Sequence, residues 1–157
     1  MASLGRLRFR LVVIAFLAGM LAAARPAAAA FQLITPAEAA LPQGTISTLA
    51  LRGSPTRRPH ITVVFPPPNG GTVHSPLDLI VRFKAFGGAK IDSSTVVLTY
   101  LKQPAIDLTQ RIEPFITAAG FTVPQAQVPP GLHRFWIELK DKDGRIGEIE
   151  FSFQVAK

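Results

Sequence analysis

The sequence predicts an all-β fold, an immunoglobulin-like β-sandwich of about seven strands over residues 60–157. Two observations predict it. Short runs of alternating apolar and polar side chains recur through this region, and turns rich in proline and glycine separate them. The region also has no long stretch with the apolar spacing of a helix. Short strands in this number over about 100 residues are typical of a two-sheet sandwich or a related small barrel.

The first two strands expected are residues 61–65 and 77–84. The first ends at three consecutive prolines and an Asn-Gly-Gly turn, which favour a change of chain direction. In the second, Leu77, Leu79 and Val81 share one face and mostly charged side chains occupy the other, as a half-buried strand requires. The remaining extended segments expected are 95–101, 106–109, 120–123, 126–128, 133–140 and 148–155.

The segments 133–140 and 148–155 alternate most regularly, and a short polar turn joins them. Asp141, Asp143 and Gly144 in this turn resemble part of a calcium-binding loop. Such a loop needs further oxygen ligands and a closing glutamate at a fixed spacing, and the glutamate that follows comes too early. We therefore expect a tight hairpin turn, which Asp-Gly pairs favour.

Residues 1–30 have the three parts of a secretory signal peptide in order. Arginines precede an apolar run at 11–24, and a series of alanines follows. Cleavage after Ala30, with Ala28 as the small residue two positions before it, leaves Phe31 at the start of the mature chain. The alternative, an uncleaved anchor, requires about 20 apolar residues, and an arginine and a proline interrupt the run earlier. We expect a periplasmic or secreted protein without an integral membrane anchor after cleavage.

Charge and composition exclude several partners and chemistries. Four of the 17 basic residues lie in residues 1–30, which contain no acidic residue. Against the other 13 stand 10 acidic side chains, and the cations are scattered along the chain. A nucleic-acid-binding surface needs several clustered cations, so we expect no nucleic-acid partner. Because the chain has no cysteine, it has no disulfide, thiol nucleophile or thiolate metal site.

Residues 31–59 are interpreted as a flexible leader before the sandwich, because their composition shows no sustained pattern. Within them Thr35, Pro36 and Glu38 have the spacing of a capping box with proline at the first helical position. Pro42 ends that single helical turn. The alternative interpretation is a docking segment that adds a strand to the open sheet edge of a partner.

Four stretches resemble bacterial immunoglobulin-like periplasmic domains: FPPPNGGTV, PLDLIVRFKA, IDSSTVVLTY and VPPGLHRFWIELKDKDGRIGEIEFSFQV. In that family the first strand ends in a Pro/Asn/Gly turn, an element with paired serines opens a middle strand, and a Pro-Gly corner leads into the penultimate strand. The resemblance covers about residues 60–157. It implies the sandwich fold but no particular ligand, because this architecture carries many functions.

The ending PPGLHRFWIELKDKDGRIGEIEFSFQV is also similar to the CopC-like copper-binding sandwiches. Those proteins bind the metal through an N-terminal histidine and have a histidine in the last hairpin turn. This chain has Phe31 and Arg145 at these two places, and a guanidinium stays protonated and does not bind a metal. The resemblance therefore implies the fold without the copper site, and we expect no metal or other cofactor.

The three histidines all have structural interpretations, and so do the two carboxylates that are best placed to act as a catalytic pair, Asp92 and Asp107. The spacing of His60, His74 and His133 matches no local metal motif. We expect the first two at the surface. His133 follows a Pro-Pro-Gly corner, where sandwiches often carry a tyrosine whose polar tip bonds the backbone. Asp92 and Asp107 each lie two residues before a hydroxyl side chain, which is typical of a turn.

No catalytic residues are predicted. The sequence contains no G-x-S-x-G motif, and Ser93 and Ser94 have no histidine near them in the chain. No set of side chains combines a nucleophile, a base and a group that orients the base.

Trp136 is the best candidate for a contact residue. Counting alternate residues along its strand puts Trp136 on the outer face beside Arg134, where an exposed indole and guanidinium can anchor a partner protein or a sugar ring. Tyr100 and Lys102 form a second, weaker candidate patch. The alternative is that the leader or a neighbouring loop covers Trp136.

Together these observations predict a non-enzymatic module that acts through protein–protein contacts in the cell envelope. A CopC-like periplasmic metal carrier and a carbohydrate-binding accessory domain are the alternatives. Trp136 is the single feature that favours the carbohydrate-binding alternative.

Overall fold

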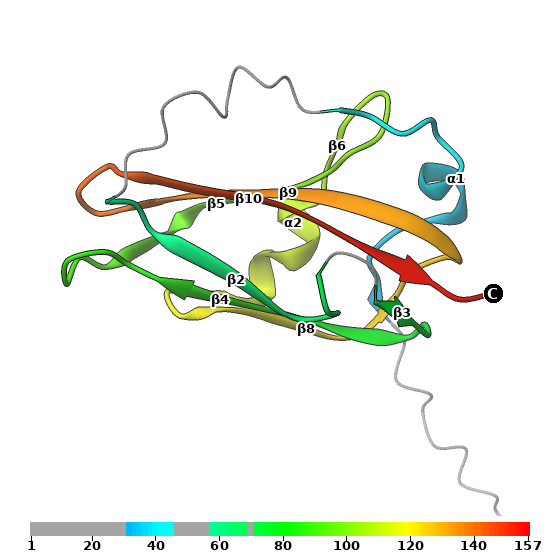
Figure 1. Cartoon of the computed structure of the whole chain (residues 1–157), viewed down its shortest axis with the longest axis horizontal. Helices are drawn as coiled ribbons and strands as arrows, with labels where there is room; N and C mark the ends of the chain where they lie inside the picture. The colour runs from blue at the N-terminus through cyan, green and yellow to red at the C-terminus, as the bar shows by residue number, and fades with distance from the viewer. Residues whose placement is uncertain (1–30, 46–56, 69–70) are drawn as a thin grey trace, which may run out of the picture.

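The alternating apolar residues of the longer strands meet in one core between two β-sheets (Figure 1). The computed structural model describes residues 31–45, 57–68 and 71–157. The strands of the first sheet are β1 (Phe31–Gln32), β2 (His60–Phe65), β4 (Leu77–Lys84), β7 (Ile116–Thr117) and β8 (Gly120–Gln127). Those of the second are β3 (Thr72–Val73), β5 (Ile91–Tyr100), β6 (Ile106–Asp107), β9 (Gly131–Asp141) and β10 (Ile146–Val155).

The strand order is that of an immunoglobulin-like sandwich. The first sheet runs β1-β8-β4-β2 with β7 also beside β8, and the second runs β3-β10-β9-β5-β6. The antiparallel set β2-β4-β8 thus faces the antiparallel set β5-β9-β10, while β3 lies parallel to β10. Immunoglobulin domains place strands A, B and E opposite C, F and G in the same way. The predicted all-β sandwich is confirmed, and the two separate sheets exclude the barrel alternative for the described residues.

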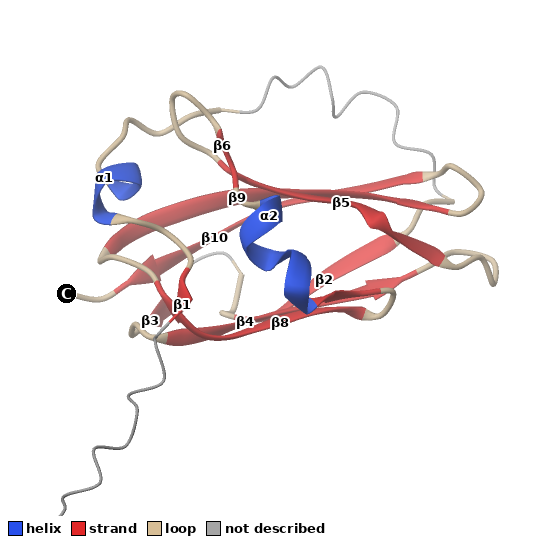
Figure 2. Ribbon diagram, turned by 180° about the vertical axis from the view of Figure 1, so that it is seen from behind, coloured by secondary structure: helices blue, strands red, loops and turns tan. Residues whose placement is uncertain are grey.

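Three short helical segments complete the described fold: α1 (Pro36–Ala39), α2 (Thr109–Ile112) and the 3-10 helix η2 (Glu113–Phe115). Figure 2 shows α2 at one side of the sandwich, where the chain crosses from β5 and β6 of one sheet to β7 and β8 of the other. Ile112 on α2 is fully buried, so this crossing also closes the core at that side.

Aromatic side chains in register form the centre of the second sheet's inner face. The Phe135 ring stacks on the rings of Phe151 and Phe153, with centroids 5.1 and 5.4 Å apart. Tyr100 on the other neighbouring strand stacks on Phe135 at 5.2 Å. Such cross-strand aromatic pairs stabilise a sheet beyond the burial of their surface.

Four predicted strands, 61–65, 77–84, 133–140 and 148–155, are confirmed to within two residues as β2, β4, β9 and β10. The segment predicted at 95–101 begins four residues earlier, as β5.

Two of the shorter predictions need correction. The pieces expected at 120–123 and 126–128 are one strand, β8, whose register with β4 shifts around Gln125, a residue with φ of 49°. The extended segment expected at 106–109 ends at Asp107. Its carboxylate accepts a hydrogen bond of 2.8 Å from the Thr109 N–H, which turns the chain into α2.

Residues 31–45 belong to the sandwich, so the interpretation of residues 31–59 as a leader or docking segment is wrong for this part. β1 pairs in parallel with β8, and Leu33 and Ile34, which follow it, are fully buried in the core. These apolar side chains fill the space beside β8 and add to the hydrophobic stabilisation of the whole domain.

The predicted capping box on this segment is confirmed. The Glu38 N–H donates to Thr35 Oγ1 at 3.2 Å, and the Thr35 N–H donates to a Glu38 carboxylate oxygen at 2.8 Å. Pro36 occupies the first turn, as its fixed φ favours.

Residues 1–30, which include the predicted signal peptide with Ala28 and Ala30, lie outside the described residues, as do residues 46–56. In the part of the chain that the structure describes, no helix has the length and apolar character needed to cross a membrane.

Candidate functional site

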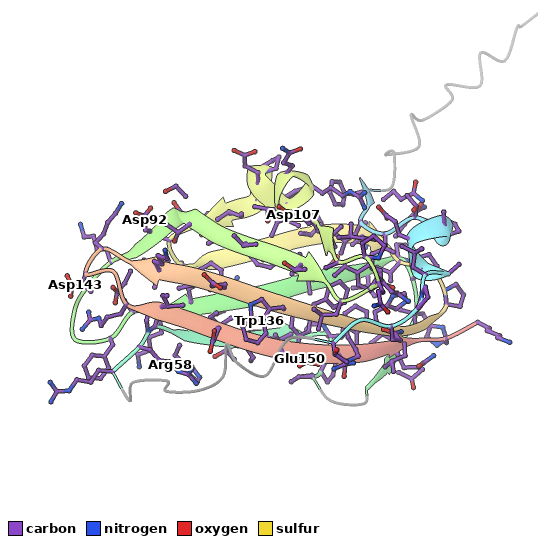
Figure 3. The ribbon with its side chains drawn as sticks, turned by 90° about the horizontal axis from the view of Figure 1, so that it is seen from above. Arg58, Asp92, Asp107, Trp136, Asp143 and Glu150 are labelled. Carbon is purple, nitrogen blue, oxygen red and sulfur yellow. The ribbon has the colours of Figure 1, made fainter. Side chains whose placement is uncertain are left out.

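Trp136 is not an exposed anchor. Its neighbours along β9 point into the core, and Trp136 lies outside the core cluster, which agrees with the predicted outer face. Its side chain is nevertheless only 8% exposed. Figure 3 shows Trp136 on β9 beside Glu150 of β10, its partner in register. The prediction of an exposed indole is therefore wrong, because counting along a strand gives the face but not what covers it.

Arg134 is partly exposed and is held by an ion pair. Its guanidinium contacts the Glu150 carboxylate through Nε at 3.0 Å and through Nη2. The third nitrogen of the guanidinium, Nη1, donates to the carbonyl oxygen of Gly44 at 3.3 Å. Arg134 thus links the second sheet to residues 31–45, which we call the N-terminal segment. Because Trp136 is buried, Trp136 and Arg134 do not form the predicted contact surface.

Tyr100 is fully buried, which corrects its assignment to a surface patch. Its hydroxyl lies 2.8 Å from His133 Nδ1, and His133 Nε2 lies 2.7 Å from the carbonyl oxygen of Pro129. A carbonyl only accepts, so Nε2 carries the proton and Nδ1 accepts from the tyrosine. Burial lowers the pKa of His133 and raises the pKa of Tyr100, so both side chains are neutral near pH 7. The predicted structural role of His133 is confirmed.

Lys102 is also buried, at 5% exposure, so it does not belong to a surface patch. It binds the N-terminal segment. Its Nζ donates to the carbonyl oxygens of Ala39 and Leu41 at 2.8 and 2.9 Å. The ammonium also lies 5.3 Å from the centroid of the Tyr100 ring. Burial lowers the pKa of Lys102.

A second charged contact holds the same segment from α2. Arg111 donates to both carboxylate oxygens of Glu38, at 2.9 and 2.6 Å, and to the carbonyl oxygen of Leu33 at 2.7 Å. This two-pronged hydrogen bonding lowers the pKa of Glu38 to about 2. Phe31, the residue expected at the mature N-terminus, packs edge to face on Phe115 with centroids 5.4 Å apart.

The two carboxylates weighed for catalysis, Asp92 and Asp107, lie in β5 and β6 and not in turns. Each still accepts a hydrogen bond from the N–H two residues further on, which is the backbone bonding that the sequence predicted. The Asp92 carboxylate accepts from the Ser94 N–H and hydroxyl, at 3.3 and 2.7 Å, and Asp107 lies in a separate part of the sandwich (Figure 3). At the β9–β10 turn, the buried Asp141 carboxylate accepts from the N–H groups of Asp143 and Arg145 at 3.0 and 2.9 Å, which confirms a hairpin turn.

No metal site forms among the described residues. They bring together no group of three or more histidine, aspartate or glutamate side chains. His60 and His74 are exposed, as expected. Arg145, at the place of the CopC-like turn histidine, donates through Nε to the Asp141 carboxylate at 2.7 Å.

A groove lies at the end of the sandwich that carries β1, β3 and Lys157. It consists of two hollows, of about 540 and 450 Å³, that meet at His74 and Pro76. We call it the end groove. Hollows of this size are typical of sites that bind small molecules or side chains of a partner.

The first hollow of the end groove has apolar and amide walls. Pro36, Pro129 and Pro130 provide rigid apolar surface, and Gln32 and Gln127 provide amide donors and acceptors. The prolines hold this shape because each fixes its own φ.

The second hollow lies against β2, β4 and β8. Phe65 and Ile80, partners in register across β2 and β4, form its apolar floor. Gln125 forms one wall, and its N–H donates to the Asp78 carboxylate at 2.9 Å. Gln125 is the only non-glycine with positive φ among the described residues. Strained backbone of this kind is concentrated at functional sites, where the surrounding structure must stabilise it.

The end groove was not predictable from the sequence because its walls come from five separate segments: 32–36, 65, 74–80, 125–130 and 156–157. Local composition offered one signal, the prolines beside His74 and before Gly131. Prolines at strand ends also serve ordinary turns, so this signal alone does not indicate a groove.

Comparison of the sequence with protein-family models and with curated proteins gives no match. The chain is similar to several solved structures, including the following two. One is an engineered protein of the Northeast Structural Genomics Consortium, with a TM-score of 0.43 and 14% identity over 64% of this chain and 20% of that one. This chain thus spans about a fifth of that protein's length. The other is CopC from Methylosinus trichosporium OB3b, with a TM-score of 0.42 and 17% identity over 62% of this chain and 94% of that one.

Proposed function

We propose that this protein is an exported, non-enzymatic immunoglobulin-like module of the cell envelope, periplasmic or secreted, that binds a segment of a partner protein in the end groove. The observation that carries the proposal is the meeting of two hollows at His74 and Pro76. Two hollows that share these lining residues suit an extended chain that places successive side chains in successive hollows.

The chemistry of the walls supports a polypeptide occupant. Proline and aliphatic surface favours apolar side chains, while Gln32, Gln125 and Gln127 can both donate to and accept from a peptide backbone. His74 is exposed at the junction and offers a further polar contact. Such a site has few charges, so it selects its partner by shape and backbone hydrogen bonding.

The rigidity of the groove also supports binding. The Ser75 hydroxyl accepts from the Val128 N–H at 3.0 Å, which joins two of the segments that line the first hollow. Asp78 holds the kink at Gln125 through its carboxylate. A site that is already in its bound shape loses less conformational entropy when the partner binds.

The other classes of function have less support. The carbohydrate-binding alternative rested on an exposed Trp136, which is buried. The metal-carrier alternative has no cluster of ligands among the described residues to support it. No arrangement of the described side chains specifically favours catalysis or nucleic-acid binding, so we retain the protein–protein proposal.

The test uses the full chain, exported with its own leader, and a displayed library of random peptides. Selected peptides are titrated into labelled protein, and the shifted backbone resonances locate the contact. We expect shifts around His74 and Gln127. Gln127→Trp should fill the first hollow and weaken binding at least tenfold, whereas Gln110→Trp, at an exposed glutamine of α2 outside the groove, should change it less than twofold.

Three outcomes would count against this proposal. The library could yield no specific peptide, the shifted resonances could map away from the end groove, or both tryptophan variants could reduce binding equally. Deleting residues 31–59 is not a suitable test, since Leu33 and Ile34 are part of the core.

A further inference from the structure

A second surface lies at the opposite end of the long axis from the end groove. There the loop between β4 and β5 and the turn between β9 and β10 project side by side (Figure 1). Two hydrogen bonds join them: Arg145 Nη2 donates to the carbonyl oxygen of Phe86 at 3.0 Å, and the Lys142 N–H donates to that of Lys90 at 2.9 Å. We call residues 84–90 and 140–146 the tip.

The tip presents apolar side chains to solvent. Phe86 is 39% exposed and Ile146 is 43% exposed. The Arg145 guanidinium lies 5.6 Å from the centroid of the Phe86 ring and holds the loop. Gly87 and Gly88, with φ of 64° and 80°, make the tight turn that directs Phe86 outward. Two large apolar side chains are thus exposed within the tip.

Cations surround these apolar groups on both faces of the sandwich. Arg145 is paired with Asp141 and Asp143, and Lys142 is paired with Asp92. The other three lysines of the tip are exposed and have no carboxylate within ion-pair distance among the described residues; they are Lys84, Lys90 and Lys140. The unbalanced charge at this end is therefore positive.

We propose that the tip binds the surface of a lipid bilayer with anionic headgroups. Phe86 and Ile146 enter the boundary between headgroups and acyl chains, and Lys84, Lys90 and Lys140 contact the anionic lipids around them. The β4–β5 loop and the β9–β10 turn together form this end of the long axis (Figure 1). Apolar insertion combined with surrounding cations is the combination by which peripheral proteins bind such surfaces. A nucleic acid would use the cations and leave Phe86 without a role.

This surface is independent of the end groove, so each proposal can fail without the other. The test measures cosedimentation of the full chain, exported with its own leader, with vesicles of phosphatidylcholine alone or with one quarter phosphatidylglycerol. All variants carry the same N-terminal residues, so differences between variants report on the tip. Near-ultraviolet circular dichroism checks that each variant is folded.

We expect at least tenfold stronger partition onto the anionic vesicles, decreasing at high salt. Phe86→Ala should weaken it about tenfold, because the ring no longer enters the boundary region. The double change Lys90→Glu with Lys140→Glu should weaken it more than tenfold, since each cation near an anionic surface contributes about fivefold. The matched controls Leu132→Ala and Lys157→Glu, at exposed positions outside the tip, should stay within twofold.

The proposal is overturned if the wild type partitions equally onto both kinds of vesicle, or if the controls lose as much binding as the tip variants. It is also overturned if polyglutamate binds the lysines of the tip while the vesicles do not bind, because the partner would then be an acidic polypeptide.

Discussion

Tyr100 and His133, 33 residues apart in the chain, share a hydrogen bond of 2.8 Å inside the sandwich. The bond joins β5 to β9 and passes on through His133 Nε2 to the backbone of Pro129. Both side chains are at most 1% exposed, so neither can replace its partner with water. The chain of bonds therefore fixes the corner that leads into β9, beside one wall of the end groove.

Tyr100→Phe should lower the free energy of unfolding by about 1–3 kcal/mol, because it leaves His133 Nδ1 buried without a donor. The ring stack on Phe135 stays, so the loss reports on the hydroxyl. Urea unfolding measures it. A loss below about 0.5 kcal/mol would mean that the hydroxyl contributes no net stability, which is the level expected of a surface substitution.

The stability of the protein should fall as the pH decreases below about 6.5. Burial lowers the pKa of His133 below 6.5, the value of an unfolded histidine, so in acid the unfolded chain binds a proton that the folded chain does not. The slope is at most about 1.4 kcal/mol per pH unit for one group. Urea midpoints at pH 7.5 and 5.5 measure it.

His133→Gln should reduce this pH dependence, while His74→Gln, at an exposed histidine, should retain it. If both variants keep the wild-type slope, the dependence comes from other groups. Glu38 does not interfere, since its change of charge is confined to pH below 4.5.

The sandwich was predictable because its strands are half-buried, and half-burial leaves a period of two in the sequence. Residues 77–84 show this directly: the structure buries every second side chain in that strand. The sequence of the N-terminal segment has no such period. Leu33 and Ile34 are buried by a strand that lies more than 80 residues away in the chain, at 120–127, and local composition does not contain that contact.

The candidate site shows the same limit. Val96, Leu98 and Tyr100 are all buried, so counting alternate residues along this strand places Tyr100 inside, against its assignment to a surface patch. For Trp136 the same counting gives the correct outer face, yet exposure there depends on covering segments that the strand pattern does not encode. The end groove depends on tertiary arrangement alone, because its walls come from five segments.

Glu38→Gln should destabilise the protein by about 1–2 kcal/mol at pH 7, because it removes the charged partner of Arg111 from a mostly buried, two-pronged contact. Hydrogen bonding to Arg111 lowers the pKa of Glu38 from 4.5 to about 2. The contact therefore contributes fully above pH 4.5, and its contribution is lost as the pH falls towards 2. Urea unfolding at pH 7 and pH 3 measures both effects.

The exposed Glu113, on η2 next to α2, provides the control, and Glu113→Gln should change stability by less than about 0.5 kcal/mol. A double-mutant cycle with Arg111→Met then isolates the pair. A coupling energy near zero would show that Glu38 acts through its capping box alone.

Lys102→Met should loosen residues 39–44 specifically. The substitution keeps an apolar stem of similar length but leaves the carbonyl oxygens of Ala39 and Leu41 without their donor. Amide hydrogen exchange should become at least tenfold faster at Ala40 and Gly44, whose N–H groups bond the carbonyl oxygens of Pro36 and Leu101. Exchange in β9 and β10 should change far less, because both hydrogen-bond acceptors of the lysine lie in the N-terminal segment.

The matched control for this prediction is Lys140→Met, at an exposed lysine of β9, which should leave exchange at Ala40 and Gly44 unchanged. If Lys102→Met instead speeds exchange uniformly, the lysine stabilises the whole sandwich. If it changes nothing, Glu38 and Arg111 hold the segment alone. A buried cation without hydrogen-bond partners is costly. The carbonyl oxygens of Ala39 and Leu41 therefore stabilise the Lys102 ammonium, and the same two hydrogen bonds hold the N-terminal segment.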